Sequence, residues 1–285
     1  MPDFQLIALD IDGTLANPQG ELSGETLRVL RRLLAADVEI VLVTGLNPWP
    51  ARRYVVQIGP IPAICLNGIF LLKGEEIHAG SFLDPAAARA AARFIVARGY
   101  VPLVYGADGV TRYLPTTEGS AAMREVAKLF AERDYQPFEP VDGIDALFAV
   151  TPAQVSVCET AERAARLQPA LAAAFDERAY VVYQPGPRAW LEVNHPDARK
   201  DVALVHFAQR RDIPPERIVY FGDSLNDLPV FRALPRAVAM GNARPEVKEL
   251  AWRIAPSNEE DGVARMLEEL FVVSYVTNEV SGVAS

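Results

Sequence analysis

Two aspartates near the N-terminus have the spacing of a metal-binding pair. Asp10 and Asp12 lie in the segment ALDIDGTL, at the end of an apolar run. On an extended backbone, residues two apart share a face, so both carboxylates can converge on one cation. Gly13 then permits a tight backbone turn. The same residues also fit an ordinary strand end and turn, so the pair indicates metal chemistry without establishing it.

Two further polar positions could bind an anion. Thr44 and Gly45 follow the apolar run EIVLV and offer a hydroxyl and a flexible backbone N–H. Lys200 follows the polar stretch NHPDARK and opens a predicted helix, where a cation is unfavourable unless an anion lies nearby. Each has an ordinary alternative, a threonine that caps the strand end and a lysine solvated on a helix surface.

The fourth polar segment is the most specific. In IVYFGDSLNDLPVF, Asp223, Asn226 and Asp227 come directly after an apolar run, and Gly222 allows close approach of another group. A helix N-cap would explain Asp223 or Ser224 alone. All four polar segments fall where parallel strands should end, which is the edge at which open α/β sheets bind ligands.

The elements that position these segments follow from periodicity. Apolar runs at 4–9 and 39–43 flank a helix that starts at Ser23 or Gly24 and has leucines at three-to-four spacing. This strand, helix and strand form a βαβ unit with parallel strands. Asn67-Gly68 separates the runs 63–66 and 69–73 and has the positive φ angles of a tight hairpin turn. The chain therefore opens as an α/β domain.

The pattern changes in the middle of the chain and then returns. Between Pro85 and Pro196, two rounds of a helix followed by strands predict an α+β layer, and after Pro196 the βα pattern resumes. We expect an α/β core of residues 1–82 and 194–285, interrupted by a smaller α+β domain at 83–193. The expected elements of the inserted domain are helices at 85–98, 120–132 and 161–175 and strands at 101–105, 111–114, 146–150, 154–158, 180–183 and 190–193. Those after it are helices at 200–211, 225–233 and 263–270 and strands at 218–221 and 237–240, with no clear periodicity at 274–285.

The ordered set DIDGTL, LVTG, a lysine well downstream, and GDSLND followed by AVAMGNA resembles the haloacid dehalogenase superfamily of aspartate-nucleophile phosphotransferases. Within it the chain is most similar to the Cof-type phosphatases, whose cap domain is inserted between the second and third motifs. The resemblance spans all but the C-terminal tail, by motifs in the core and by arrangement in the cap. It implies a Rossmann-like parallel-sheet core with an inserted α+β cap that determines substrate specificity.

The resemblance also implies a role for each matching residue. Asp10 matches the nucleophile that forms an aspartyl-phosphate, and Asp12 matches the general acid and base. Mg²⁺ would be held by the carboxylates of Asp10 and Asp223 and the backbone carbonyl of Asp12, with Asp227 bracing that site. The phosphate-binding residues it implies are Thr44, Gly45, Lys200 and Asn226.

One position departs from the family pattern. Relatives commonly have an arginine directly after the Thr-Gly pair, whereas this chain has Leu46, which cannot contact an anion. Arg52 or Arg53 on the following helix could supply the missing group. By analogy with the family, candidates for substrate contact in the cap are Arg112, Tyr183, Arg188 and Glu192. Solvated arginines and a half-buried sheet tyrosine are the ordinary alternatives for the first three.

The amino-acid composition limits the classes of binding partner and the cellular compartment that we expect. The 285 residues carry 28 basic and 37 acidic side chains, a formal net charge of −9, which argues against nucleic-acid binding. Two cysteines are too few for a disulfide scaffold, which fits a reducing cytoplasm. The sequence has no signal-peptide pattern and no apolar run long enough to cross a membrane, so we expect an unexported cytoplasmic monomer or homodimer.

We therefore expect a Mg²⁺-dependent phosphatase, a hydrolase of phosphoric monoesters, that acts on a small phosphorylated metabolite. Sugar phosphates are the leading substrate class. One alternative is a phosphomutase, which passes the phosphoryl group to another hydroxyl. Another is a non-catalytic module of the same fold that binds a phosphorylated metabolite.

Overall fold

The computed structural model describes residues 4–115, 125–126, 128, 138–175, 178–184 and 188–281, without the side chains of 272–281. The chain divides into two compact units. Unit 1 comprises Met1–His78 and Lys200–Ser285, and unit 2 comprises Ala79–Arg199. The sequence placed these boundaries at 82/83 and 193/194. The two units are described separately below.

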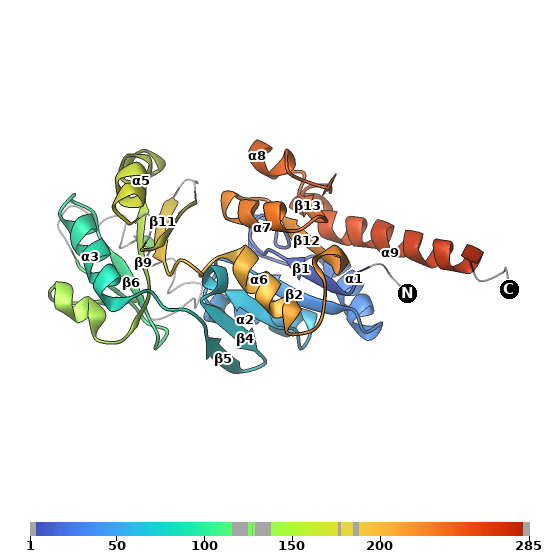
Figure 1. Cartoon of the computed structure of the whole chain (residues 1–285), viewed down its shortest axis with the longest axis horizontal. Coiled ribbons are helices and arrows are strands. Elements are labelled where there is room, and N and C mark those ends of the chain that lie inside the picture. The colour runs from blue at the N-terminus through green and yellow to red at the C-terminus, as the bar shows by residue number, and fades with distance from the viewer. Residues whose placement is uncertain are drawn as a thin grey trace. The chain divides into compact units, whose positions relative to one another are not determined.

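Unit 1 is built on an eight-stranded sheet (Figure 1), with strand order β14-β13-β12-β1-β2-β3-β4-β5. The register is parallel from β14 through β3, and β4 is antiparallel to β3. The central strands are continuous apolar runs because helices cover both faces of such a sheet. Their bounds are β1 (Leu6–Leu9), β2 (Glu39–Val43), β3 (Ala63–Cys65), β4 (Phe70–Lys73), β5 (Glu76–Ala79), β12 (Ile218–Gly222), β13 (Ala237–Ala239) and β14 (Arg253–Ile254). The predicted parallel α/β core is confirmed.

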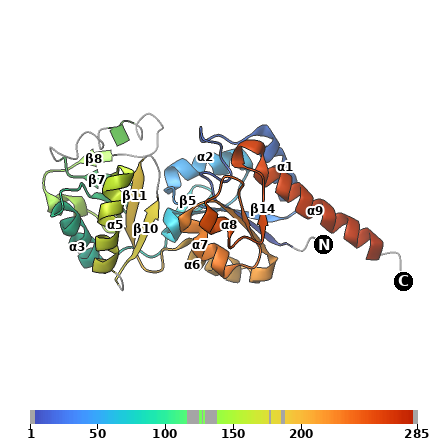
Figure 2. The same ribbon diagram turned by 90° about the horizontal axis from the view of Figure 1, so that it is seen from above.

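The α-helices of unit 1 are α1 (Gly24–Ala35), α2 (Pro48–Ile58), α6 (Lys200–Gln209), α7 (Leu228–Ala233), α8 (Pro245–Lys248) and α9 (Gly262–Ser281). Helix α1 begins at Ser23, whose hydroxyl accepts a hydrogen bond from the Thr26 N–H at 3.0 Å. It packs against α9 (Figure 2). The predicted helix at 225–233 is a 3₁₀ turn, η4 (Leu225–Asp227), followed by α7. Helix α9 extends to Ser281, well past the predicted end at 270.

Unit 2 is a six-stranded sheet of order β10-β11-β9-β6-β7-β8, antiparallel except for the β7–β8 pair. Its strands are β6 (Leu103–Gly106), β7 (Thr111–Tyr113), β8 (Phe138–Pro140), β9 (Pro152–Glu159), β10 (Tyr180–Gln184) and β11 (Ala189–Asn194). Helices α3 (Pro85–Val96) and α5 (Ala161–Phe175) pack on one face, where Ile95 and Leu171 meet Val155 and Leu191. The predicted α+β layer has this arrangement.

One predicted element of unit 2 differs from the structure, and another lies mostly outside the described residues. The strand predicted at 146–150 is wrong, because the chain forms a 3₁₀ helix, η2 (Ile144–Phe148). Leu147 and Phe148 are both buried in the same apolar cluster, whereas consecutive residues of a strand point to opposite faces. The helix predicted at 120–132 lies mostly outside the described residues; Glu125, Val126 and Lys128 are described and are helical.

Candidate active site

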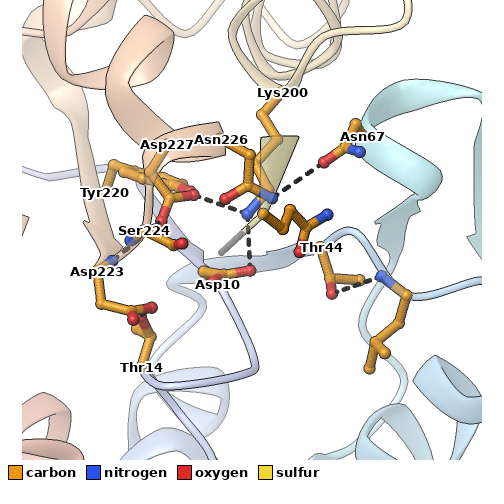
Figure 3. A network of polar contacts seen from close by, with 12 residues as sticks. Asp10, Thr14, Thr44, Asn67, Lys200, Tyr220, Asp223, Ser224, Asn226 and Asp227 are labelled. Carbon is orange, nitrogen blue, oxygen red and sulfur yellow. Dashed lines mark hydrogen bonds and ion pairs between the residues drawn. The ribbon is translucent and has the colours of Figure 1, made fainter. Parts of the chain in front are cut away.

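The parallel sheet of unit 1 brings the predicted site residues to one edge. Strand β1 lies between β12 and β2, so the segments that follow these three strands converge at their carboxyl ends. Asp10 comes directly after β1 and is 4% exposed, and its N–H donates to the Phe221 carbonyl at 3.0 Å. The strand register therefore fixes Asp10 beside the segment that holds Asp223 and Asp227 (Figure 3).

Lys200 is the first residue of α6, and its side chain is fully buried. Its Nζ donates to Asp10 Oδ1 at 2.8 Å and to Asp227 Oδ1 at 2.6 Å (Figure 3). Burial lowers the pKa of Lys200, but the charges of Asp10 and Asp227 outweigh it, so the net pKa lies above the ordinary value. Burial between two carboxylates excludes the alternative of a lysine solvated on a helix surface.

Asp227 is saturated with hydrogen-bond donors. Its Oδ2 accepts from the backbone N–H groups of Asp223 and Ser224, both at 2.9 Å. Its Oδ1 accepts from Lys200 Nζ and, at 2.5 Å, from the Tyr220 hydroxyl. A carboxylate offers about four lone-pair sites, and these four donors engage them all. Asp227 therefore braces its neighbours and has no free lone pair for a metal ion.

Asp10 and Asp223 remain as the carboxylates that could hold a metal ion. One carboxylate oxygen each from Asp10, Asp223 and Asp227 lies within 4.8 Å of the others. Thr14 Oγ1 donates to Asp223 Oδ1 at 2.9 Å, which orients this carboxylate. Burial raises the pKa of Asp223 to about 7 and raises that of Asp10 well above its ordinary value. Adjacent buried carboxylates are hard oxygen donors whose repulsion a divalent cation relieves, so the donor set fits Mg²⁺.

Asp12 lies at the exposed side of this cluster. It is solvent-exposed and pairs through its backbone with Ala16. Its charge contributes to the raised pKa of Asp223, so the two carboxylates are electrostatically coupled. Gly13, the next residue, has a φ of +76°, and a Cβ built on it would lie 2.4 Å from Asp223 Oδ2. The turn after β1 therefore requires glycine both for its conformation and for the position of Asp223.

Thr44 directly follows β2 and is buried, with Gly45 next to it in the turn. Its Oγ1 accepts from the Leu46 N–H at 3.0 Å, so the threonine caps the turn and its own O–H proton remains available for donation. The backbone carbonyl of Thr44 accepts from the Asn67 N–H at 3.0 Å. Thr44 therefore caps the turn through its hydroxyl oxygen, as the ordinary alternative predicted. The hydroxyl proton can still donate to an anion.

Asn67 is a site residue that the sequence indicated only as part of a turn. It is 1% exposed, has a φ of +55°, and its Oδ1 accepts from Asn226 Nδ2 at 3.2 Å (Figure 3). Its neighbour Leu66 also has a positive φ, of +46°. Asn67 therefore links the Thr44 turn to Asn226. Its position at the end of β3, the strand next to β2, was the signal that could have identified it.

The two arginines considered as substitutes for the missing family arginine have contacts elsewhere. Arg53 Nη2 donates to the Gly20 carbonyl at 2.9 Å, and the guanidinium lies 4.5 Å from the Tyr54 ring centroid. Arg52 Nη2 donates to the Glu75 carbonyl at 2.9 Å, and its guanidinium lies 5.5 Å from the Trp49 ring centroid. These contacts anchor loops of unit 1.

The predicted substrate contacts of unit 2 are spread over its sheet. Arg112 on β7 is largely buried and forms an ion pair with Asp108 at 2.7 Å, which lowers the pKa of Asp108. Glu192 on β11 is buried and accepts from Gln184 Nε2 at 2.8 Å. Tyr183 on β10 packs into the apolar cluster beneath the helices.

Glu192 and Tyr183 lie on opposite faces of the sheet, because the register pairs Glu192 with Val182 and Tyr183 with Leu191. Arg188, just before β11, is partly exposed and pairs with Glu125 at 3.7 Å. Within unit 2, therefore, the four candidates do not form one cluster.

Comparison with known proteins identifies relatives over nearly the full length. The chain is 26% identical over 294 residues to the 5-amino-6-(5-phospho-D-ribitylamino)uracil phosphatase YwtE of Bacillus subtilis, covering 95% of this chain and 100% of the relative. It is 27% identical over 283 residues to YitU of the same organism, a phosphatase of the same description, covering 93% and 97%.

Among solved structures, SMU.1108c of Streptococcus mutans matches with a TM-score of 0.80 at 19% identity, covering 94% of this chain and 99% of that one, which shows the same fold. Among the described residues, no helix is long and apolar enough to span a membrane. The model of the haloacid dehalogenase-like hydrolases matches residues 7–267, so the chain belongs to this family.

Proposed function

We propose that this protein is a Mg²⁺-dependent phosphatase that hydrolyses a small phosphorylated metabolite through an aspartyl-phosphate on Asp10. The observation that carries the proposal is the buried contact between Lys200 Nζ and Asp10 Oδ1, with Asp223 beside it. A fixed ammonium next to two carboxylates is unfavourable for a purely structural core, because both ion types lose hydration on burial. The same arrangement suits a site that receives a phosphate dianion.

In the first step, the Asp10 oxygen that is not bonded to Lys200 attacks phosphorus. The new O–P bond forms as the bond to the leaving oxygen breaks, and Asp12 gives that oxygen its proton. In the second step, Asp12 takes a proton from water, which attacks phosphorus and releases inorganic phosphate and free Asp10. The exposed position of Asp12 is compatible with contact to both the leaving group and water.

The remaining residues offset charge and orient the phosphate. Lys200 uses two of its three N–H groups on Asp10 and Asp227, which leaves one for a phosphate oxygen. The Thr44 hydroxyl proton, the Gly45 N–H and Asn226 supply neutral donors. A divalent cation bound by Asp10, Asp223 and the Asp12 carbonyl would keep both carboxylates ionised and offset the charge of the substrate.

The relatives bear on the substrate class. Two are named as phosphatases of a phosphorylated ribitylamino compound, in which the phosphate sits on a polyhydroxylated chain. We propose a sugar-like phosphate monoester for this chain, with unit 2 acting as the specificity cap. Arg112, Tyr183, Arg188 and Glu192 remain candidate contacts in that unit.

The experiment is inorganic phosphate release from a panel of sugar phosphates, flavin and pyridoxal phosphates and an aryl phosphate, with Mg²⁺ or with EDTA. Asp10→Asn should abolish release, whereas Asp145→Asn, an exposed control in unit 2, should not. Release that requires Mg²⁺ and no acceptor would exclude a phosphomutase. Binding of phosphate with no release by the wild type would overturn the proposal and favour the mutase or the binding module.

A further inference from the structure

Tyr220 is a buried titratable residue that the reaction steps above do not use. It lies in the middle of β12 and is completely buried. In register, its neighbours on the adjacent strands are Ala8 and Ala237, and these small side chains leave room for the ring on that face of the sheet. Gly222, two residues further along the same face, places no side chain between the Tyr220 ring and Asp227.

The space beside Gly222, between Tyr220 and Asp227, is too small for a side chain. A Cβ built on Gly222 would lie 2.7 Å from Asp227 Oδ2 and 2.9 Å from Tyr220 Cε1. The Phe231 ring meets the Tyr220 ring edge to face, with centroids 5.9 Å apart and an interplanar angle of 86°. These neighbours hold the Tyr220 ring in place and so fix the direction of its hydroxyl.

The Tyr220 hydroxyl donates to Asp227 Oδ1, the atom that also accepts from Lys200. The two donor distances are 2.5 Å from the Tyr220 hydroxyl and 2.6 Å from Lys200 Nζ. Burial and the charge of Asp227 raise the pKa of Tyr220 well above its ordinary value, so the hydroxyl stays a donor. Lys200 therefore shares this oxygen with Tyr220 and also donates to Asp10.

We infer that Tyr220 is a positioning residue that fixes Asp227 and thereby directs the Lys200 ammonium to Asp10 and the substrate phosphate. By donating to Oδ1 beside Lys200, the hydroxyl fixes the orientation of this carboxylate and occupies a lone pair that could otherwise bind metal. The inference rests on the proposed function, because it assigns Lys200 the phosphate as its third partner.

Tyr220→Phe tests this role, since it removes only the hydroxyl. Tyr54→Phe is a matched control: Tyr54 is also fully buried in unit 1, and its hydroxyl donates to the Gly20 carbonyl at 3.0 Å. With an aryl phosphate and Mg²⁺, Tyr220→Phe should lower kcat/KM by about tenfold or more. Tyr54→Phe should keep kcat/KM within about twofold, although both variants lose a buried hydrogen bond.

A second measurement separates positioning from general stability. The affinity for inorganic phosphate with Mg²⁺ is measured by calorimetry for wild type, Tyr220→Phe, Lys200→Met and the double variant. If Tyr220 acts through Lys200, its removal weakens binding in the wild type and has no further effect once Lys200 is gone. Equal losses in both backgrounds would overturn the inference.

The outcomes also distinguish the two proposals. A wild type that releases phosphate alongside an equally active Tyr220→Phe variant would refute the role of Tyr220 and leave the phosphatase intact. A wild type that releases no phosphate would refute the phosphatase. The phosphate-binding cycle would then decide whether Tyr220 positions Lys200.

Discussion

Three aspartates lie within one cluster, yet their partners give them different chemistry. Asp227 accepts hydrogen bonds on both oxygens, from Lys200, Tyr220 and two backbone N–H groups. Asp10 accepts from Lys200 on Oδ1, and Asp223 accepts from Thr14 on Oδ1. A carboxylate whose four lone-pair sites are all engaged is a poor nucleophile or ligand, so the number of donors separates Asp227 from Asp10 and Asp223, which keep lone pairs for these roles.

Asn67 gives a prediction at this scale, because its backbone and its side chain can be tested separately. Glycine accepts a φ of +55° freely, whereas alanine at such an angle costs about 1 kcal/mol. Both Asn67→Gly and Asn67→Ala remove the acceptor of Asn226 Nδ2. We expect both variants to lose phosphatase activity to a similar extent, with Asn67→Ala the less stable by about 1 kcal/mol in urea unfolding.

The same two variants also show whether only the backbone of Asn67 matters. If Asn67→Gly were as active as the wild type, the residue would serve only the left-handed backbone at the end of β3. Its amide would then have no part in orienting Asn226.

At the scale of elements, the turn after β1 decides where the carboxylate of Asp223, the residue directly after β12, lies. Gly13→Ala places a Cβ 2.4 Å from Asp223 Oδ2 and must displace that carboxylate. Gly74→Ala is a matched control, since Gly74 also has a positive φ, of +61°, with nothing within 4 Å of the added Cβ. Both changes should cost about 1 kcal/mol of stability through backbone strain.

Only Gly13→Ala should raise the Mg²⁺ concentration needed for half-maximal rate. It should also lower kcat/KM, by roughly 100-fold, because an ångström of misplacement is enough for a loss of this size. Titration of the rate with Mg²⁺ measures both effects. Similar metal dependence in the two variants would show that Asp223 does not depend on the Gly13 turn.

Much of the core could be predicted from the sequence, because a parallel sheet follows from continuous apolar runs and its polar ends are visible as breaks in them. The strand that contains Tyr220 was predicted on this basis, and the parallel core is confirmed. The role of the Tyr220 hydroxyl could not be predicted, since it depends on Ala8 and Ala237 in adjacent strands and on the absence of a side chain at Gly222.

The errors have similar causes. Residues 146–150 have the composition of a strand, but Leu147 and Phe148 belong to the 3₁₀ helix η2 and are both buried in one cluster. Strand β8 was not among the predicted strands, and it pairs with β7 in parallel. Contacts between distant segments decide such cases, and local periodicity does not contain them.

At the scale of the whole molecule, the buried acidic cluster links stability to pH. Burial raises the pKa of Asp223 from 3.8 to about 7. Between about pH 4 and pH 7, the folded state keeps a proton that the unfolded state has lost, so the free energy of unfolding falls as the pH rises. Hydrogen bonds lower the pKa values of carboxyls such as Glu25 and Glu260, so these groups stabilise the fold as the pH rises through the ordinary carboxyl range and add no further pH dependence above it.

We therefore expect the melting temperature in EDTA to decrease from about pH 5 to about pH 8. Mg²⁺ should raise it more at the upper end, because the cation binds the ionised carboxylates without first displacing a proton. Asp223→Asn removes one titrating group and should flatten the decrease, while Asp10 still contributes a part. Thermal melts across this range, with EDTA and with Mg²⁺, measure both effects. A melting temperature in EDTA that is constant or rises with pH would contradict this prediction. It would show that ionisation of the buried carboxylates does not destabilise the fold, so that no cation is required to hold them together.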